Sequence, residues 1–215
     1  MQRLIGLAVL LFSTLVPARA SLTINADIIR KSAVFIYPAD GAGAADATKP
    51  LGTGFLVFVP FKNANGAGGG YVLLVTARHI LKPTWAGCPT TDPSRIYLRL
   101  NSKKFDPTVN QSGVEFVSVD LANQDVHTKM FESTDPQIDA VVVVLNPTKF
   151  SPEKYELSAI SISDFATPEE LSRLSTGDSI VSAGLVPGAQ GEHRNYPVFK
   201  FGEISTILDE PFVTG

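Results

Sequence analysis

The sequence predicts an all-β fold, on the basis of three observations. Short apolar runs rich in Val, Ile, Phe and Tyr recur along the chain. Tracts rich in Gly, Pro and Asn separate these runs, as turns and loops do. Only one stretch carries the start and stop signals of a helix. Many short strands with turn-rich connections and one minor helix are typical of a β-barrel or a β-sandwich.

Eight apolar runs are the expected strands. They comprise residues 32–37, 54–59, 71–76, 96–101, 114–119, 140–145, 180–186 and 198–207. Residues 63–70 (NANGAGGG) predict a flexible hairpin connection, because glycine tolerates backbone conformations that other residues avoid. The helix is expected at residues 167–174, since Thr167 can cap it, Pro168 suits its first position and Gly177 follows its end.

Length and composition indicate a globular protein. The chain has 215 residues, of which 44% are hydrophobic and 18% charged, so it can bury a core as one domain or two small ones. A net charge of −3 argues against a nucleic-acid partner, since phosphate binding needs clustered Lys and Arg. Cys88 is the only cysteine, which excludes an intramolecular disulfide. We interpret it as a small packed or idle thiol.

The first 20 residues have the pattern of a secretory signal peptide. Arg3 precedes an apolar run over residues 4–16, and Ala18 and Ala20 supply the small residues of a cleavage site. The run is shorter than the roughly 20 residues that a membrane-spanning helix needs, so we expect no stable membrane insertion. An uncleaved anchor is the alternative. The expected mature chain begins at Ser21 and is secreted or periplasmic.

The histidines give no metal-binding pattern. The chain has three, His79, His127 and His193, and none belongs to an HExxH motif or to a pair at helical i, i+4 spacing. Cys88 has no CxxC partner. We therefore expect neither a metal nor another cofactor.

Two residues suit nucleophilic catalysis instead. His79 follows the strand at 71–76, where a short turn can hold its ring at a surface cleft. Asp139 opens the apolar strand at 140–145, and an acid in that position is partly desolvated unless something pairs with it. A histidine base with a carboxylate that fixes its tautomer is the core of a catalytic triad. The alternatives are a structural histidine at a strand end and a turn or cap aspartate.

Three motifs in chain order resemble those of trypsin-like serine peptidases, particularly the secreted bacterial forms without disulfides. They are residues 52–57 (GTGFLV), 75–81 (VTARHIL) and 139–145 (DAVVVVL). In that family the T-A-x-H turn bears the base, and a D-x-A-V strand bears the triad aspartate. Ala140 follows the acid directly here, one residue short of that spacing. The resemblance implies that His79 is the general base, that Asp139 orients it, and that the substrate is a protein or peptide.

The resemblance also implies a double β-barrel, with the first barrel complete and the second partial. Residues 21–150 would form the first barrel with both motifs. Residues 151–215 would supply a connection and part of the second barrel. In that part, residues 177–187 (GDSIVSAGLVP) are similar to an early strand of the family's second barrel, and residues 201–205 (FGEIS) to the strand that follows it.

The family's nucleophile motif, G-x-S-G-G or G-x-S-G-x-P, does not occur in the sequence. Ser179 lies in a Gly-Asp-Ser triplet, but Ile180 follows it where oxyanion chemistry needs small residues. Ser182 and Ser205 fit no better.

We expect a secreted serine endopeptidase whose serine lies beyond Gly215. The alternatives are a non-catalytic homologue that binds peptides or proteins, and an unrelated secreted β-domain in which the histidine and aspartate do not meet. The sequence sets neither cleavage specificity nor oligomeric state.

Overall fold

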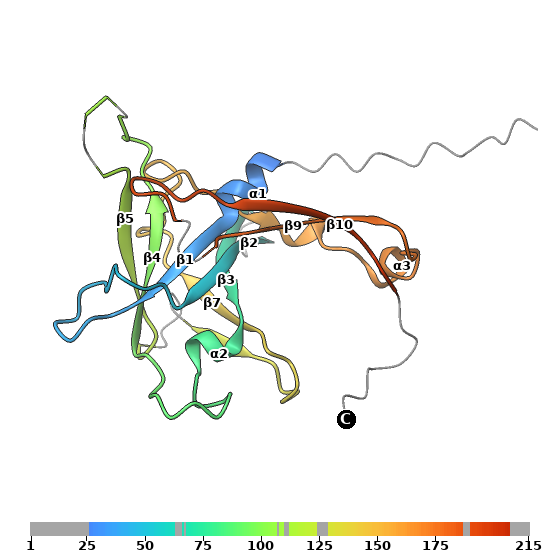
Figure 1. Cartoon of the computed structure of the whole chain (residues 1–215), viewed down its shortest axis with the longest axis horizontal. Helices are drawn as coiled ribbons and strands as arrows, with labels where there is room; N and C mark the ends of the chain where they lie inside the picture. The colour runs from blue at the N-terminus through green and yellow to red at the C-terminus, as the bar shows by residue number, and fades with distance from the viewer. Residues whose placement is uncertain are drawn as a thin grey trace, which may run out of the picture.

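The structure is a computed structural model that describes residues 26–62, 66, 68–106, 108–109, 112–123, 129–186 and 190–206. The predicted signal peptide (residues 1–20), His127 and the end of the last predicted strand lie outside the described residues. Strands predominate and the helices are short, so the prediction of a mainly β fold is confirmed (Figure 1).

The strands divide into one large and one small sheet. Their bounds are β1 Ala33–Pro38, β2 Gly52–Lys62, β3 Gly68–Thr76, β4 Arg95–Asn101, β5 Val114–Asp120, β6 Met130–Glu132, β7 Val141–Leu145, β8 Ile160–Ser161, β9 Ser179–Gly184 and β10 Val198–Glu203. The large sheet has the order β5-β4-β1-β2-β3-β7-β6 and curls into a half-barrel. All of its neighbours are antiparallel except β8, which runs parallel to the middle of β2 at Val57 and Phe58. The small sheet contains β9 and β10 alone.

The large sheet is covered on both faces around β1. Val34 and Ile36 point into the main core, while Phe35 and Tyr37 alternate to the other face and pack with Leu185. These four residues of β1 are at most 2% exposed. A strand buried on both faces needs a continuous apolar run, which is why this segment lacks the alternating pattern of a half-exposed strand. Residues after position 150 also contribute, since Tyr155 belongs to the main core.

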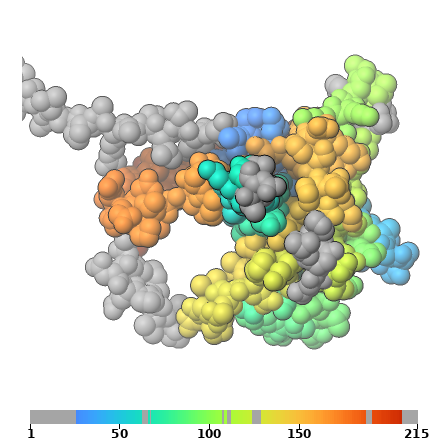
Figure 2. Space-filling model, turned by 180° about the vertical axis from the view of Figure 1, so that it is seen from behind, coloured from blue at the N-terminus to red at the C-terminus, as the bar shows by residue number. Residues whose placement is uncertain are grey.

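The β9–β10 hairpin projects from the large sheet. In Figure 1 it extends away from β1 and β2, and the 3₁₀ helix η1 (Ile162–Asp164) and the helix α3 (Pro168–Leu171) precede it in the chain. The view from behind shows the orange segment, which carries α3, standing to one side of the large sheet (Figure 2). Neither strand of the hairpin contains a fully buried residue.

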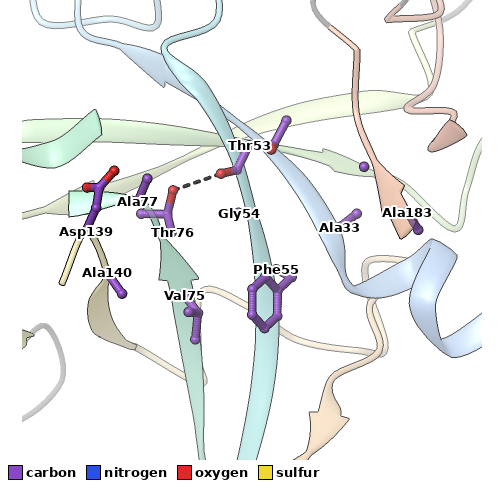
Figure 3. Close-up of a pocket in the computed structure, with 11 residues that line it drawn as sticks. Ala33, Thr53, Gly54, Phe55, Val75, Thr76, Ala77, Asp139, Ala140 and Ala183 are labelled. Carbon is purple, nitrogen blue, oxygen red and sulfur yellow. Dashed lines mark hydrogen bonds between the residues drawn. The ribbon is translucent and has the colours of Figure 1, made fainter. Parts of the chain in front are cut away.

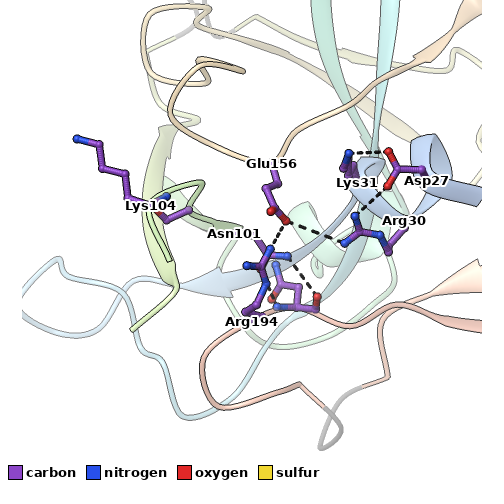
Figure 4. Close-up of polar contacts among 9 residues, drawn as sticks. Asp27, Arg30, Lys31, Asn101, Lys104, Glu156 and Arg194 are labelled. Carbon is purple, nitrogen blue, oxygen red and sulfur yellow. Dashed lines mark hydrogen bonds and ion pairs between the residues drawn. The ribbon is translucent and has the colours of Figure 1, made fainter. Parts of the chain in front are cut away.

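A network of polar contacts fastens the segment between β9 and β10 to the large sheet. The ion pair of Arg194 with Glu156, and the contact of Arg30 with the same carboxylate, are drawn in Figure 4. Asn195 exchanges hydrogen bonds with Asn101: its N–H donates to the Asn101 side-chain oxygen at 2.7 Å. We call residues 190–195 the covering segment, because they lie over the β4 face that carries Arg99.

All eight predicted strands are present with shifted ends, and the structure adds β6 and β8. Residues 68–70 were expected in a turn but belong to β3, which corrects that prediction. A Cβ on Gly69 or Gly70 would lie 2.9 or 2.1 Å from the rings of Phe61 and Phe58, so these rings can lie over the strand only beside glycine.

The predicted helix at 167–174 is shorter than expected. Thr167 and Glu170 form a capping box, yet α3 ends at Leu171. Leu171 and Leu174 remain about half exposed, so no buried apolar face extends the helix beyond one turn. The helix α1 (Ala26–Ser32), which the sequence analysis did not predict, is longer.

Candidate functional site

His79 lies on a single helical turn directly after β3. The strand ends at Thr76, whose hydroxyl donates to the Thr53 carbonyl at 2.8 Å, and α2 (Arg78–Leu81) begins two residues later. Leu81, at 1% exposure, anchors the turn in the main core. Ala77 occupies the N-cap and has no side chain that can satisfy the first N–H groups of the turn. Those donors need a partner from elsewhere in the fold.

Asp139 supplies that partner because of the register between β3 and β7. These strands are antiparallel, and Thr76 pairs with Val141. The residues just after β3 therefore lie beside those just before β7. The Asp139 carboxylate consequently reaches α2, although it is 60 residues away from His79 in sequence.

Asp139 contacts His79 at two points. Its Oδ1 accepts the His79 backbone N–H at 2.9 Å, and its Oδ2 lies 2.6 Å from the ring nitrogen Nδ1. The backbone hydrogen bond from His79, the ring contact and a backbone hydrogen bond from Arg78 hold the pKa of the Asp139 carboxyl below its ordinary value. An ionised carboxylate only accepts hydrogen bonds, so Nδ1 carries the proton. In the neutral ring Nε2 is then free to act as a base.

The pair is open to solvent on one side. The side chains of His79 and Asp139 are 51% and 39% exposed. The expected contact between the two predicted residues is therefore present, and their catalytic role stays a prediction.

His193 lies elsewhere, with its ring stacked 6.2 Å from Phe105. Among the described residues no group of three or more His, Cys, Asp or Glu is placed to hold a metal ion.

A cavity of about 460 Å³ adjoins Asp139. Figure 3 shows it between Asp139 and Ala140 on one side and Ala33 and Ala183 on the other, with Phe55 and Gly54 in its wall. Gly54 is required by the close approach of β2 to β3, since a Cβ there would lie 2.7 Å from the Leu74 side chain and 2.9 Å from the Val75 carbonyl. The small wall residues leave room for a further chain segment beside the acid.

Sequence reasoning missed the residues that fix α2 from the other side. Glu132 on β6 accepts from Arg78 at 2.7 Å and from Lys82 at 2.5 Å, so it clamps the turn before and after His79. The Arg78 guanidinium also lies 4.9 Å from the centre of the Trp85 ring. No local pattern identifies Glu132, because β6 is only three residues long and about 50 residues from α2 in sequence.

The serines considered as nucleophiles lie in or next to the hairpin. Ser179 and Ser182 are in β9, opposite Glu203 and Lys200, and Ser205 follows β10. Within the described part of the chain no serine hydroxyl is hydrogen-bonded to the His79 ring. Cys88, expected to be packed or idle, is exposed and free.

None of the helices among the described residues has the length and apolar character needed to cross a bilayer.

Comparisons with family models, curated proteins and solved structures found no match for this chain. The geometry of His79, Asp139 and their surroundings is therefore the guide to function.

Proposed function

We propose that this protein is a secreted serine endopeptidase of the trypsin-like type, in which His79 is the general base and Asp139 its orienting acid. The observation that carries the proposal is the two-point contact of the Asp139 carboxylate with the backbone and ring of His79. The serine is supplied by residues outside those the structure describes. The hairpin of β9 and β10 is then part of a second barrel.

The two-point contact suits a triad because it fixes both the tautomer and the direction of the ring. The first contact holds the α2 backbone, and the second leaves Nε2 unprotonated. In the proposed reaction Nε2 takes the serine proton as the serine oxygen attacks the peptide carbonyl. The same proton then goes to the leaving amine. Water repeats the sequence on the acyl-enzyme, which releases the acid and the free serine.

Two further features support this proposal. The motifs around Gly54, His79 and Asp139 occur in the order and elements that the resemblance implies. Alanine and glycine residues make up much of the wall of the cavity beside Asp139, so a backbone that bears the serine can approach Asp139 along that part of the wall. A structural histidine in contact with a capping aspartate explains the hydrogen bonds but not the adjoining cavity.

Proteolysis by the native secreted protein tests the proposal. An unfolded protein substrate should be cleaved, and His79→Gln should abolish the cleavage. Asp139→Asn should reduce kcat by about 10⁴-fold, because the ring would then favour the wrong tautomer. His193→Gln is the matched control and should retain full activity, since His193 contacts Phe105 rather than the pair. Cleavage that persists in His79→Gln would refute the proposal.

A peptide-binding module without catalysis is the second candidate. It is favoured by the lack, among the described residues, of a serine bonded to the His79 ring. Saturable peptide binding by a native protein that cleaves nothing would support this candidate against the first.

Sequencing of the secreted protein's N-terminus, expected at Ser21, tests export independently of both.

A further inference from the structure

A second cavity lies under the covering segment, on the same face of the large sheet as the cavity beside Asp139. It has a volume of about 360 Å³. Tyr37 on β1, Arg99 on β4 and Phe116 on β5 form its floor, and Ser112 and the backbone of Gly191 border it. In the strand register Arg99 is opposite Phe35 on one side and Phe116 on the other. A guanidinium therefore lies among aromatic rings.

Arg99 is buried and has no carboxylate partner among the described residues. The residue is 4% exposed. Its Nη1 donates to the Asn195 side-chain oxygen at 2.9 Å, and its Nη2 to the carbonyls of Gly191 and Glu192 at 2.6 and 3.0 Å. All three acceptors are neutral. A guanidinium has five N–H donors, so two of them have no acceptor among the described residues. Burial of an uncompensated charge is costly, which favours a bound anion.

The Tyr37 hydroxyl is a second unused donor in the same cavity. Tyr37 is 1% exposed, and its ring packs edge-on against Phe116 with a centroid distance of 5.1 Å. The hydroxyl makes no hydrogen bond to the residues that the structure describes, and it is not among their fully buried unpartnered atoms, so it can donate into the cavity that Tyr37 lines. Burial raises the pKa of Tyr37, so the hydroxyl keeps its proton and can donate.

We propose that this cavity binds a small organic carboxylate. Its oxygens accept from the remaining donors of Arg99 and from the Tyr37 hydroxyl, and its apolar part contacts the Tyr37 and Phe116 rings. One carboxylate balances the one unpaired guanidinium, and its planar pair of oxygens matches the guanidinium fork. The Tyr37 and Phe116 rings offer contacts for the apolar part of an organic acid, which inorganic phosphate lacks. The site is independent of the proposed peptidase activity.

Glu192 gives this proposal a distinctive electrostatic consequence. Its backbone carbonyl accepts from Arg99, while its own carboxylate is 88% exposed at the cavity rim and lies 3.9 Å from His193 Nε2. A negative charge at the rim opposes the approach of an anionic ligand. Removal of that charge by Glu192→Gln should tighten carboxylate binding, and the backbone contact to Arg99 would stay intact.

Titration of the full-length protein with benzoate, followed by NMR, tests the site. Benzoate should shift the Arg99 Nε–Hε resonance in a saturable way, and benzamide, which has nearly the same shape but no charge, should not. Tyr37→Phe should weaken binding by about tenfold, because it removes one hydrogen bond to a charged group and keeps the ring. Arg99→Lys should abolish saturable binding. Glu192→Gln should lower the Kd a few-fold, by roughly the amount that one exposed like charge contributes.

Three results would overturn the proposal: no saturable shift with benzoate, an equal response to benzamide, or unchanged affinity in both Tyr37→Phe and Glu192→Gln. The last two variants make the test decisive even if Arg99→Lys does not fold. His79→Gln should bind benzoate like the wild type. Failure of the carboxylate site is therefore distinguishable from failure of the peptidase proposal.

Discussion

The large sheet and the β9–β10 hairpin differ in where their apolar side chains lie. In the large sheet Leu74, Ile96 and Val143 are fully buried. In the hairpin Ile180 is 47% exposed and Phe201 80% exposed. An isolated two-stranded hairpin is marginally stable at best in water. The difference teaches that the large sheet is stabilised by its own core, whereas the hairpin depends on its attachment.

The hairpin is attached through Leu185 and the covering segment rather than through its strands. Leu185, directly after β9, packs with Phe35 and Tyr37. Asn195 and Arg194 then join the segment to β4 and to Glu156. We therefore expect mutations in the large sheet to unfold the protein, and mutations in the covering segment to release the hairpin.

Truncation of a core leucine should have the largest effect. Leu74→Ala leaves a cavity between β2 and β7 and should lower the free energy of unfolding by about 2–5 kcal/mol. Ile180→Ala, the matched change in the hairpin, should lower it by less than about 0.5 kcal/mol. Denaturant unfolding measures both. Equal losses in the two variants would mean that the hairpin has a buried face of its own.

Removal of the Asn195 side chain should be next in size. Asn195→Ala deletes the bonds to the Arg99 carbonyl at 2.6 Å and from Arg99 Nη1 at 2.9 Å, both buried, at a cost of about 2–4 kcal/mol. Hydrogen exchange should show lost protection in β9 and β10 and retained protection in the large sheet. Lys200→Gln, an exposed change on β10, is the control. A uniform loss of protection throughout the chain would contradict the separate attachment of the hairpin.

A pair of glycine substitutions sharpens the comparison. Gly54→Ala places a Cβ 2.7 Å from the Leu74 side chain and 2.9 Å from a backbone carbonyl, and should destabilise the protein by about 1–3 kcal/mol. Gly184→Ala in the hairpin meets nothing within 4 Å. It should stabilise by less than about 1 kcal/mol, because alanine restricts the unfolded chain. Thermal unfolding distinguishes the two directions, and destabilisation by Gly184→Ala would show crowding in the hairpin.

The smallest expected effect is the acid sensitivity of the Asp139 contact. Its pKa is lowered from 3.8 in the folded protein, so the stability that the ionised carboxylate contributes is present above that value. It is lost as the pH falls through the lowered pKa. The difference in free energy of unfolding between wild type and Asp139→Asn should therefore be constant near neutral pH and shrink below about pH 4. A difference that does not change with pH would mean that the carboxylate gains nothing from His79.

The sequence predicted those features that depend on local pattern. The strands at residues 33–38 and 141–145 follow from apolar runs, and the turn after β3 follows from where that run stops. The contact of His79 with Asp139 was expected from the resemblance, and the register of β3 and β7 provides its physical reason.

Other features depend on contacts between distant segments and have no local signal. The clamp by Glu132 requires a three-residue strand to pair with β7. The cavity around Arg99 exists because residues 190–195 cover a face of β4 almost a hundred positions earlier in the chain. In the sequence Arg99 and Tyr37 look like ordinary strand residues, and no local pattern marks either of them as part of a cavity.

Labelling of the native protein with a fluorophosphonate tests the central claim most directly. The reagent bonds its phosphorus to the oxygen of an activated serine and releases fluoride, and peptide mapping then locates that serine. We predict one labelled serine in the wild type, loss of labelling in His79→Gln and full labelling in His193→Gln. A folded protein in which no serine is labelled, or in which His79→Gln is labelled as strongly as the wild type, would contradict the assignment of His79 and Asp139 to a catalytic triad.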